Sequence, residues 1–442
     1  ASNIGSEHLI GLAGAGASSG MAMAHWEIQG WMILILGWVF VPFYTRSMVY
    51  TMPEFLERRY NPQSRTILSV ISLVSYVLTK VAVTVYAGGL VFQQVFGIKE
   101  LWGIDFFWIA AIGLVVLTAL YTIFGGMKSV LYTSVLQTPI LLLGSLIILV
   151  LGFKELGGWD EMMRVCGAVT VNDYGDTMTN LIRSNDDANF PWLGALIGSA
   201  IIGFWYWCTD QFIVQRVLSG KNEMEARRGT IFGAYLKLLP VFLFLIPGMI
   251  AFALHQKYIG AGGEGFLPML ANGTANADAA FPTLVAKLLP AGVKGLVVCG
   301  ILAALMSSLA SLFNSSAMLF TIDFYKRFKP ETPEKKLVGI GQIATIVIVV
   351  LGILWIPIMR SVGDVLYTYL QDVQSVLAPG IAAAFLLGIC WKRTSAQGGM
   401  WGLIAGMVIG LTRLGAKVYY SNAGEVADST FKYLFYDMNW LF

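Results

Sequence analysis

The sequence opens with Ala1-Ser2-Asn3-Ile4-Gly5-Ser6, a run that is too polar for a helix exposed to lipid. A second apolar segment looks interrupted at Gly203, just before the cluster Trp205-Tyr206-Trp207. Each segment heads a set of five helical spans, which is the spacing expected of an inverted repeat with its binding site at the membrane midplane. Chance could produce the same pattern, because glycine is common in membrane helices.

Apolar runs long enough to cross about 30 Å of hydrocarbon recur along the whole chain. Of its 442 residues, 57% are hydrophobic and 12% are charged, whereas an average soluble domain is about 25% charged. We therefore predict an all-α polytopic membrane protein. After a half-helix at 9–24, the predicted spans are 28–45, 66–96, 106–127, 129–153, 192–209, 229–254, 295–322, 337–359, 365–391 and 394–412.

These spans predict a single transmembrane domain over residues 1–442. The first repeat is expected at about 1–156, the second at about 188–392, and an extra helix at about 394–417. The sequence starts without a methionine, and a new apolar segment begins at 433. We therefore expect a fragment of a longer protein, without an N-terminal helix and further C-terminal helices.

The distribution of charge predicts the orientation of the chain. When alternate sides are assigned to the loops, one side collects short loops with basic residues such as Arg58, Lys221 and Lys326, while 155–191 on the other side is long and acidic. The positive-inside rule makes the first side cytoplasmic.

Several classes of protein are disfavoured. The net charge of +3 is spread over dispersed Lys and Arg residues, so no nucleic-acid partner is expected. The sequence shows no nucleophile beside a base, no His-rich metal set and no phosphate loop, which argues against an enzyme. The four cysteines are scattered and are expected to be free thiols.

Polar side chains at membrane depth are few, and each is costly unless it faces a partner or water. Together with the ring of Tyr206 or Trp207, they offer donors, acceptors and an aromatic face, which suits a neutral polyol better than an amino acid. Other interpretations stay open: Glu27 can cap a helix, His8 can be a core residue, and the aromatic cluster can be an interfacial belt. The deep polar residues are Asn3, His8, Glu27, Lys80, Lys237 and Gln371.

A second constellation could bind a cation. Ala304, Ser307 and Ser308 share one helical face, so a locally open Ala304 carbonyl and two hydroxyls can point to one spot. Unwound carbonyls of Ala1 and Ile4 opposite them would complete five oxygens, the ligands that Na⁺ prefers. The same spacing also suits close helix packing, and serines can bond back to the preceding turn.

Four runs stand out for their combination. They are the opening hexapeptide with His8, Thr51-Met52-Pro53-Glu54-Phe55-Leu56, Trp205-Tyr206-Trp207-Cys208-Thr209-Asp210-Gln211 and Ser307-Ser308-Leu309-Ala310-Ser311. Together they resemble the sodium/glucose cotransporter branch of the sodium/solute symporter family, and the likeness extends from residue 1 to about 402. The resemblance implies the leucine-transporter-type fold, a five-plus-five inverted repeat with extra helices at both ends and a broken, here truncated, first helix.

The resemblance also implies a function: Na⁺-coupled symport of a small neutral sugar, glucose or galactose, by alternating access in a plasma membrane or a bacterial inner membrane. A myo-inositol or other polyol symporter, or a sugar-gated channel or sensor, remains an alternative. The implied sugar site is Asn3, His8, Glu27, Tyr206, Trp207, Lys237 and Gln371, with Tyr206 as the cytoplasmic gate. The implied Na⁺ ligands are Ala1, Ile4, Ala304, Ser307 and Ser308.

Two residues depart from the family pattern. Ser134 stands where many relatives have an aspartate that is linked, with the serine matching Ser311, to a second cation site, so we predict one Na⁺ per sugar. Gly203 stands where relatives place a hydrogen-bonding side chain near the sugar, so an epimer preference does not carry over. Lys80 is expected either to pair with Asp210 or to line a water path.

Overall fold

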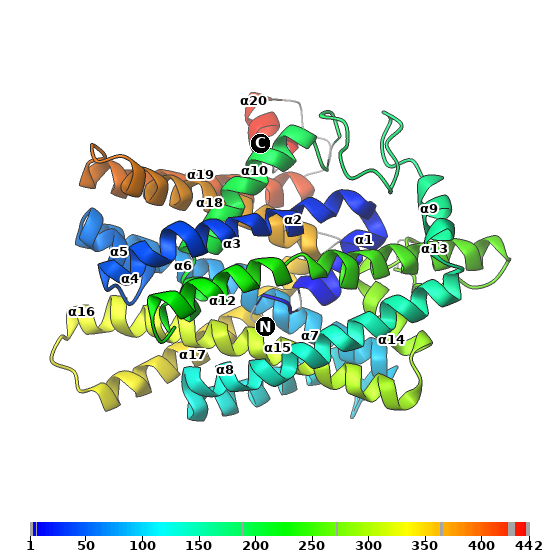
Figure 1. Cartoon of the computed structure of the whole chain (residues 1–442), viewed down its shortest axis with the longest axis horizontal. Coiled ribbons are helices and arrows are strands. Elements are labelled where there is room, and N and C mark those ends of the chain that lie inside the picture. The colour runs from blue at the N-terminus through cyan, green and yellow to red at the C-terminus, as the bar shows by residue number, and fades with distance from the viewer. Residues whose placement is uncertain are drawn as a thin grey trace.

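The computed structural model describes residues 3–5, 7–187, 189–270, 273–362, 366–422 and 429–438. Most of its helices run roughly along the long axis of the molecule, whereas α9 and α10 are inclined to it (Figure 1). The strands in this part of the chain, β1 (Glu100–Leu101) and β2 (Ile104–Asp105), form one short antiparallel hairpin. The predicted all-α class is confirmed.

The first half of the chain begins with short helical pieces and continues with longer helices. The symbol η marks 3₁₀- and π-helical turns. In order, the elements are η1 (Glu7–Leu12), α1 (Ala13–Ser19), η2 (Gly20–Met23), α2 (Ala24–Ile28), η3 (Gln29–Trp31), α3 (Met32–Ile35), η4 (Leu36–Phe40), α4 (Val41–Ser47), α5 (Met52–Arg59), α6 (Pro62–Ser75), η5 (Tyr76–Val81), α7 (Ala82–Phe96), α8 (Phe106–Leu156) and α9 (Trp159–Gly167).

The second half repeats the alternation of short and long elements. It consists of α10 (Trp192–Phe204), η6 (Trp205–Thr209), α11 (Gln211–Leu218), α12 (Glu223–Leu236), η7 (Val241–Leu245), α13 (Ile246–Gly260), η8 (Ala277–Ala279), α14 (Ala280–Leu288), α15 (Ala291–Met318), η9 (Leu319–Tyr325), α16 (Lys326–Phe328), α17 (Glu334–Val362), α18 (Leu366–Cys390), α19 (Ala396–Asn422), α20 (Thr430–Lys432) and η10 (Tyr433–Asp437). The predicted boundaries of the two repeats stay a prediction.

Nine helical stretches within the described residues are long and apolar enough to cross a membrane, which makes this a multi-pass membrane protein. The predicted spans match them except in two places. The half-helix at 9–24 and the span 28–45 belong to one stretch, His8–Ser47, and 106–127 and 129–153 are joined in one helix, Phe106–Leu156, of which Gln137–Leu156 counts among the nine. The predicted break depended on the charge of Lys128, and a single lysine removes no backbone hydrogen bond, so the helix continues past it.

The interruption predicted in the sixth span lies at Asp210, not at Gly203. Gly203 belongs to α10, whereas Asp210 has extended backbone angles (φ −76°, ψ 125°) between η6 and α11. Its carboxylate accepts a hydrogen bond from the Phe212 amide at 3.1 Å and so caps α11. The break therefore comes from an aspartate that competes for backbone amides rather than from a flexible glycine.

Gly20 forms the turn between the opening helix and the next span. Its φ of 72° lies in the left-handed region, and a Cβ there would collide with the Met178 carbonyl oxygen. The neighbouring Met21 amide donates to that same carbonyl at 2.8 Å. Only glycine permits both the backbone conformation and this approach, which attaches the loop after α9 to the turn.

Candidate functional site

Lys237, directly after α12, lies at the centre of a buried polar cluster. Its ammonium donates to Asn3 Oδ1 at 2.8 Å and pairs with Glu27 Oε2 at 2.6 Å. The same nitrogen lies 2.8 Å from His8 Nε2, which is 3.4 Å from Glu27 Oε1. Lys237 is 6% exposed and Glu27 is 1% exposed, so these charges neutralise each other away from bulk solvent.

Two aromatic side chains of η6 complete this cluster. Asn3 Nδ2 donates to the Tyr206 hydroxyl at 3.0 Å, and the Lys237 ammonium lies 5.5 Å from the centre of the Trp207 ring. The two rings pack edge to face, with centroids 4.9 Å apart. The structure thus brings together every predicted solute residue except Gln371, whose side chain lies outside the described part of the chain.

The space enclosed by the cluster is about 30 Å³. That volume holds about one water molecule, whereas pockets for small ligands measure about 300–1,000 Å³. The polar groups around it are paired with each other. A small molecule bound here would therefore have to replace these internal bonds and widen the space.

Gln29 and Gln374 also line this space and were missed in the sequence analysis. A Cβ on Gly203 would collide with Gln29 Oε1, so the glutamine amide fills the room that the glycine leaves. Gln29 is 8% exposed, and its Oε1 has no hydrogen-bond partner among the described residues. Gln374 could have been identified from the sequence, because it lies three residues after Gln371 and therefore on the same helical face.

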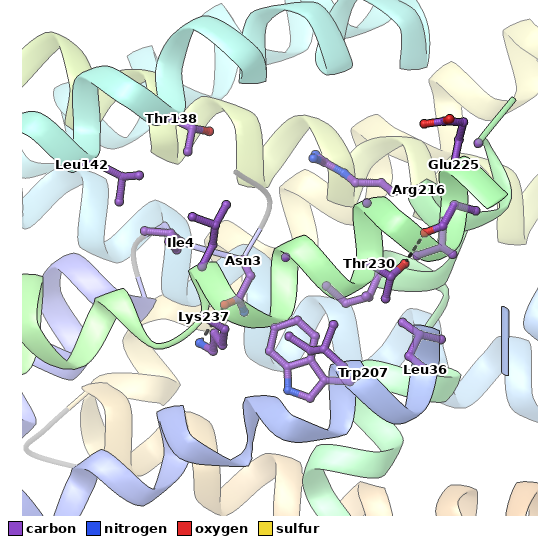
Figure 2. Close-up of a pocket in the computed structure, with 18 residues that line it drawn as sticks. Asn3, Ile4, Leu36, Thr138, Leu142, Trp207, Arg216, Glu225, Thr230 and Lys237 are labelled. Carbon is purple, nitrogen blue, oxygen red and sulfur yellow. Dashed lines mark hydrogen bonds between the residues drawn. The ribbon is translucent and has the colours of Figure 1, made fainter. Parts of the chain in front are cut away.

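A larger cavity of about 360 Å³ leads away from the cluster. Asn3, Lys237 and Trp207 line one part of it, and Arg216 and Glu225, at the ends of α11 and α12, line another (Figure 2). The connection between α11 and α12 lies on the predicted cytoplasmic side. In the predicted orientation, this cavity therefore extends from the cluster towards the cytoplasmic side.

The opposite side is covered by the loop after α9. Arg183 in this loop is 3% exposed, donates to the Ser19 carbonyl and lies 3.7 Å from Asp187. Phe190 packs against the His25 ring with centroids 5.6 Å apart. With the Met178 contact at Gly20, these interactions hold the loop over the outer end of the opening helix.

The opening segment also contacts the predicted cation site. Ile4 and Gly5 are buried, and a Cβ on Gly5 would collide with Ser308 Oγ and lie 3.9 Å from the Ala304 carbonyl oxygen. Ser308 of α15 therefore lies against the opening run, as the predicted ligand set requires. Ala1 lies outside the described residues. The predicted opening at Ala304 is not seen, because α15 continues unbroken from Ala291 to Met318.

Hydrogen bonds connect three serines next to the predicted cation site. Ser307 Oγ lies 2.8 Å from Ser134 Oγ, and Ser311 Oγ donates to the Ser307 carbonyl at 2.8 Å. The Arg216 guanidinium donates to Ser311 Oγ. A cationic group at that hydroxyl disfavours a second cation there, because like charges repel.

Lys80 pairs with Asp210, one of the two roles considered for it. Its ammonium contacts Asp210 Oδ2, while the Tyr76 hydroxyl donates to Oδ1 at 2.6 Å. The same ammonium lies 4.7 Å from the Tyr206 ring centre and 4.1 Å from that of Phe212. This pair fixes the helix break next to Tyr206.

Replacing Lys80 by methionine is expected to destabilise the protein by about 3–5 kcal/mol, because it leaves a buried carboxylate without its counter-charge. Thermal unfolding of the purified protein measures the loss. Adding Asp210→Asn to the same chain should recover part of the stability. An unchanged unfolding midpoint in Lys80→Met would show that the pair does not stabilise the break.

Comparison with known proteins identifies the family. The model of the sodium:solute symporter family matches residues 1–406. The chain belongs to the sodium:solute symporter family. This is a family of transporters, and its members include proteins named as cotransporters of sodium with myo-inositol or glucose.

Curated relatives of this symporter-family chain share more than a third of its residues. Sodium/myo-inositol cotransporter 2 of Homo sapiens is 38% identical over 427 residues, which cover 94% of this chain and 62% of the relative. Sodium/glucose cotransporter 4 of Mus musculus is 38% identical over 433 residues, which cover 95% and 62%. The chain thus spans 62% of the length of these relatives.

Solved structures show the same fold. The substrate-bound outward-open state of a Na⁺-coupled sialic acid symporter matches with a TM-score of 0.71 at 20% identity, covering 92% of this chain and 86% of the other. A manganese transporter mutant of Eremococcus coleocola matches with a TM-score of 0.52 at 12% identity, covering 96% and 88%. The predicted leucine-transporter-type fold of this symporter-family chain is confirmed.

Proposed function

We propose that this chain couples the inward movement of one Na⁺ to that of one small neutral sugar or polyol. The observation that carries the proposal is the double contact of the opening segment. Asn3 is bonded to Lys237 and Tyr206 in the solute cluster, while Gly5, two residues further on, lies against Ser308 in the ion region. One short segment thus contacts both regions, and occupation of one can organise the other.

The proposed ion ligands are the hydroxyls of Ser307 and Ser308 and the carbonyls of Ala1, Ile4 and Ala304, the last through the lone pair that its helical hydrogen bond leaves free. The proposed solute ligands are Asn3, His8, Glu27, Tyr206, Trp207, Lys237 and Gln371. Gln29 is added because it lines the same space and its side-chain oxygen has no hydrogen-bond partner among the described residues. Tyr206 acts as the inner gate. Its hydroxyl is held by Asn3, so displacement of that bond by a solute would change the position of the ring.

Glucose or galactose is the solute expected from the sequence, and myo-inositol is the second candidate. The cluster offers a carboxylate, an ammonium and amides, which together satisfy hydroxyls that both donate and accept. The same side chains could bind the hydroxyls of a sugar or of a cyclitol, so they do not distinguish the two candidates. The myo-inositol alternative gains support from relatives named as sodium/myo-inositol cotransporters at 38% identity.

One ion supplies enough free energy for accumulation. A single charge crossing about 100 mV contributes about 2.3 kcal/mol, and a tenfold Na⁺ gradient adds about 1.4 kcal/mol. The sum of about 3.7 kcal/mol supports a solute ratio of several hundredfold.

Uptake into liposomes tests the proposal. Labelled glucose, galactose and myo-inositol should accumulate only when an inward Na⁺ gradient is imposed, with one charge moved per solute. Uptake without Na⁺ would contradict symport. Currents without solute uptake would indicate a channel or sensor instead.

A further inference from the structure

An apolar groove of about 490 Å³ lies between α6, η5, η9 and α17. Every side chain that lines it is aliphatic or aromatic. It shares no lining residue with the solute cluster or with the cavity of Figure 2. On α17 its wall is a stripe of four side chains that are 47–65% exposed: Ile343, Val347, Leu351 and Leu354. The groove is therefore open at the outer surface of the helix bundle.

The position of the groove within the membrane spans decides what fills it. Its walls belong to the spans Pro62–Phe96, Ala291–Phe328 and Glu334–Pro357. A surface groove at this depth faces hydrocarbon and not water, so its exposed side chains are covered by lipid. An acyl chain suits this wall, because the wall carries no charged, hydroxyl or amide side chain.

Basic residues are concentrated at one end of the groove. α16, which directly follows η9, lies at the same end of the molecule as α4 and α5, the end predicted to be cytoplasmic (Figure 1). Residues 326–336 contain five basic and two acidic residues, which gives this segment a net charge of +3. The five basic residues are all exposed: Lys326, Arg327, Lys329, Lys335 and Lys336. A positive segment at the end of an apolar groove complements an anionic lipid.

Arg327 lies over the α6 wall of the groove. Its Nη1 donates to the Pro62 carbonyl at 2.8 Å and contacts Thr66 Oγ1. Thr66 precedes the groove residue Leu73 by seven positions, so both lie on one face of α6, with the threonine about 10 Å nearer the cytoplasmic end. Both contacts of Arg327 use Nη1, and the other guanidinium nitrogens can bind phosphate oxygens.

Lys336 holds the corresponding position on α17. It precedes Ile343 by seven residues and therefore lies on the same face of the helix, about 10 Å nearer the cytoplasmic end. The acidic residue Glu334, two positions earlier, lines a different cavity together with Lys326. Arg327 and Lys336 thus place one positive charge at the cytoplasmic end of each wall.

We propose that this groove binds one acyl chain of an anionic phospholipid, whose phosphate is held by Arg327 and Lys336. The predicted orientation places this lipid in the cytoplasmic leaflet. The inference does not depend on which solute is transported. A lipid bound in this way contacts α6, η9 and α17 together and stabilises their packing.

Equilibrium binding of labelled phosphatidylglycerol and labelled phosphatidylcholine to the purified chain in detergent tests the inference. The two probes carry the same acyl chains and differ in the net charge of the headgroup. The unaltered protein should bind phosphatidylglycerol about 30-fold more tightly, because each basic residue near an anionic headgroup contributes about a factor of five. The double variant Arg327→Gln with Lys336→Gln should bind the two lipids about equally.

A matched control for the headgroup is the double variant Lys221→Gln with Arg228→Gln. It removes two exposed basic residues from the same predicted side of the membrane, around the start of α12, and should keep the preference for phosphatidylglycerol.

A second pair of variants tests the groove itself. Val347→Trp fills the groove and should weaken the binding of both lipids by at least about tenfold, the factor that corresponds to two fewer buried methylene groups. Val350→Trp is its control, because Val350 is 49% exposed on the same helix but does not line the groove.

Equal affinities of the two lipids for the unaltered protein would overturn the inference, and so would loss of the preference in the Lys221 and Arg228 variant. Unchanged affinities in Val347→Trp would show that the acyl chain lies elsewhere and would equally contradict the site. Thermal unfolding without added lipid checks that each variant is folded. The proposed transport function is tested by Na⁺-driven uptake, so a failure of lipid binding leaves it unaffected.

Discussion

Replacing Lys237 by alanine is expected to reduce Na⁺-driven solute uptake by at least about 100-fold. The ammonium donates to Asn3 and pairs with Glu27. Its removal leaves the buried carboxylate without its counter-charge, which costs about 3–5 kcal/mol of free energy. Initial uptake rates in liposomes, normalised to the amount of folded protein, measure the effect.

Two further variants distinguish a role in solute binding from a role in folding. Lys257→Ala is the matched control, because that ammonium lies near the end of α13 and donates to the Leu156 carbonyl at 3.0 Å, away from the cluster. The double variant Lys237→Met with Glu27→Gln removes both charges and should recover stability but not uptake. Recovery of uptake in the double variant would contradict a direct role of these charges in binding.

Replacing Ser308 by alanine is expected to raise the Na⁺ concentration for half-maximal uptake by at least about tenfold. The proposed ion loses one hydroxyl ligand, and a polar interaction with a charged partner contributes about 1.5–3 kcal/mol. Ser307→Ala should act in the same direction. Uptake measured over a range of Na⁺ concentrations gives the shift.

The control for this prediction is on the same helix. Ser316 of α15 is more deeply buried than Ser308, at 0% against 9% exposed, and lies more than two turns beyond it. Ser316→Ala should therefore leave the Na⁺ dependence unchanged. An equal shift in both alanine variants would indicate a general packing effect of α15 instead of ion coordination.

Membrane-depth polar residues were the most informative part of the sequence. Lys237 lies more than 200 residues after Asn3 and Glu27 along the chain, yet each of the three was singled out because an unpaired polar group is costly in lipid. Span length and the two expected interruptions predicted an inverted repeat, and the leucine-transporter-type fold came from the resemblance to the family. These signals depend on the bilayer as solvent, so they can be read without coordinates.

Other features required the structure. The break falls at Asp210 because its carboxylate caps α11 and pairs with Lys80 from a different span, and a linear pattern does not show such a partner. The Gln29 side chain can lie beside the solute cluster only because Gly203 has no side chain in that position. Both depend on contacts between distant segments. The lengths of the apolar runs also did not predict that α8 continues past Lys128 as one helix.

The central claim is that the segment from Asn3 to His8 couples the two ligands. The most direct test is the dissociation constant of the transported solute for the unaltered protein, measured without Na⁺ and in saturating Na⁺, with the Na⁺ constant measured in return. We predict that each ligand tightens the binding of the other by one and the same factor, within about 5–150-fold. Solute binding that is equally tight with and without Na⁺ would contradict the claim.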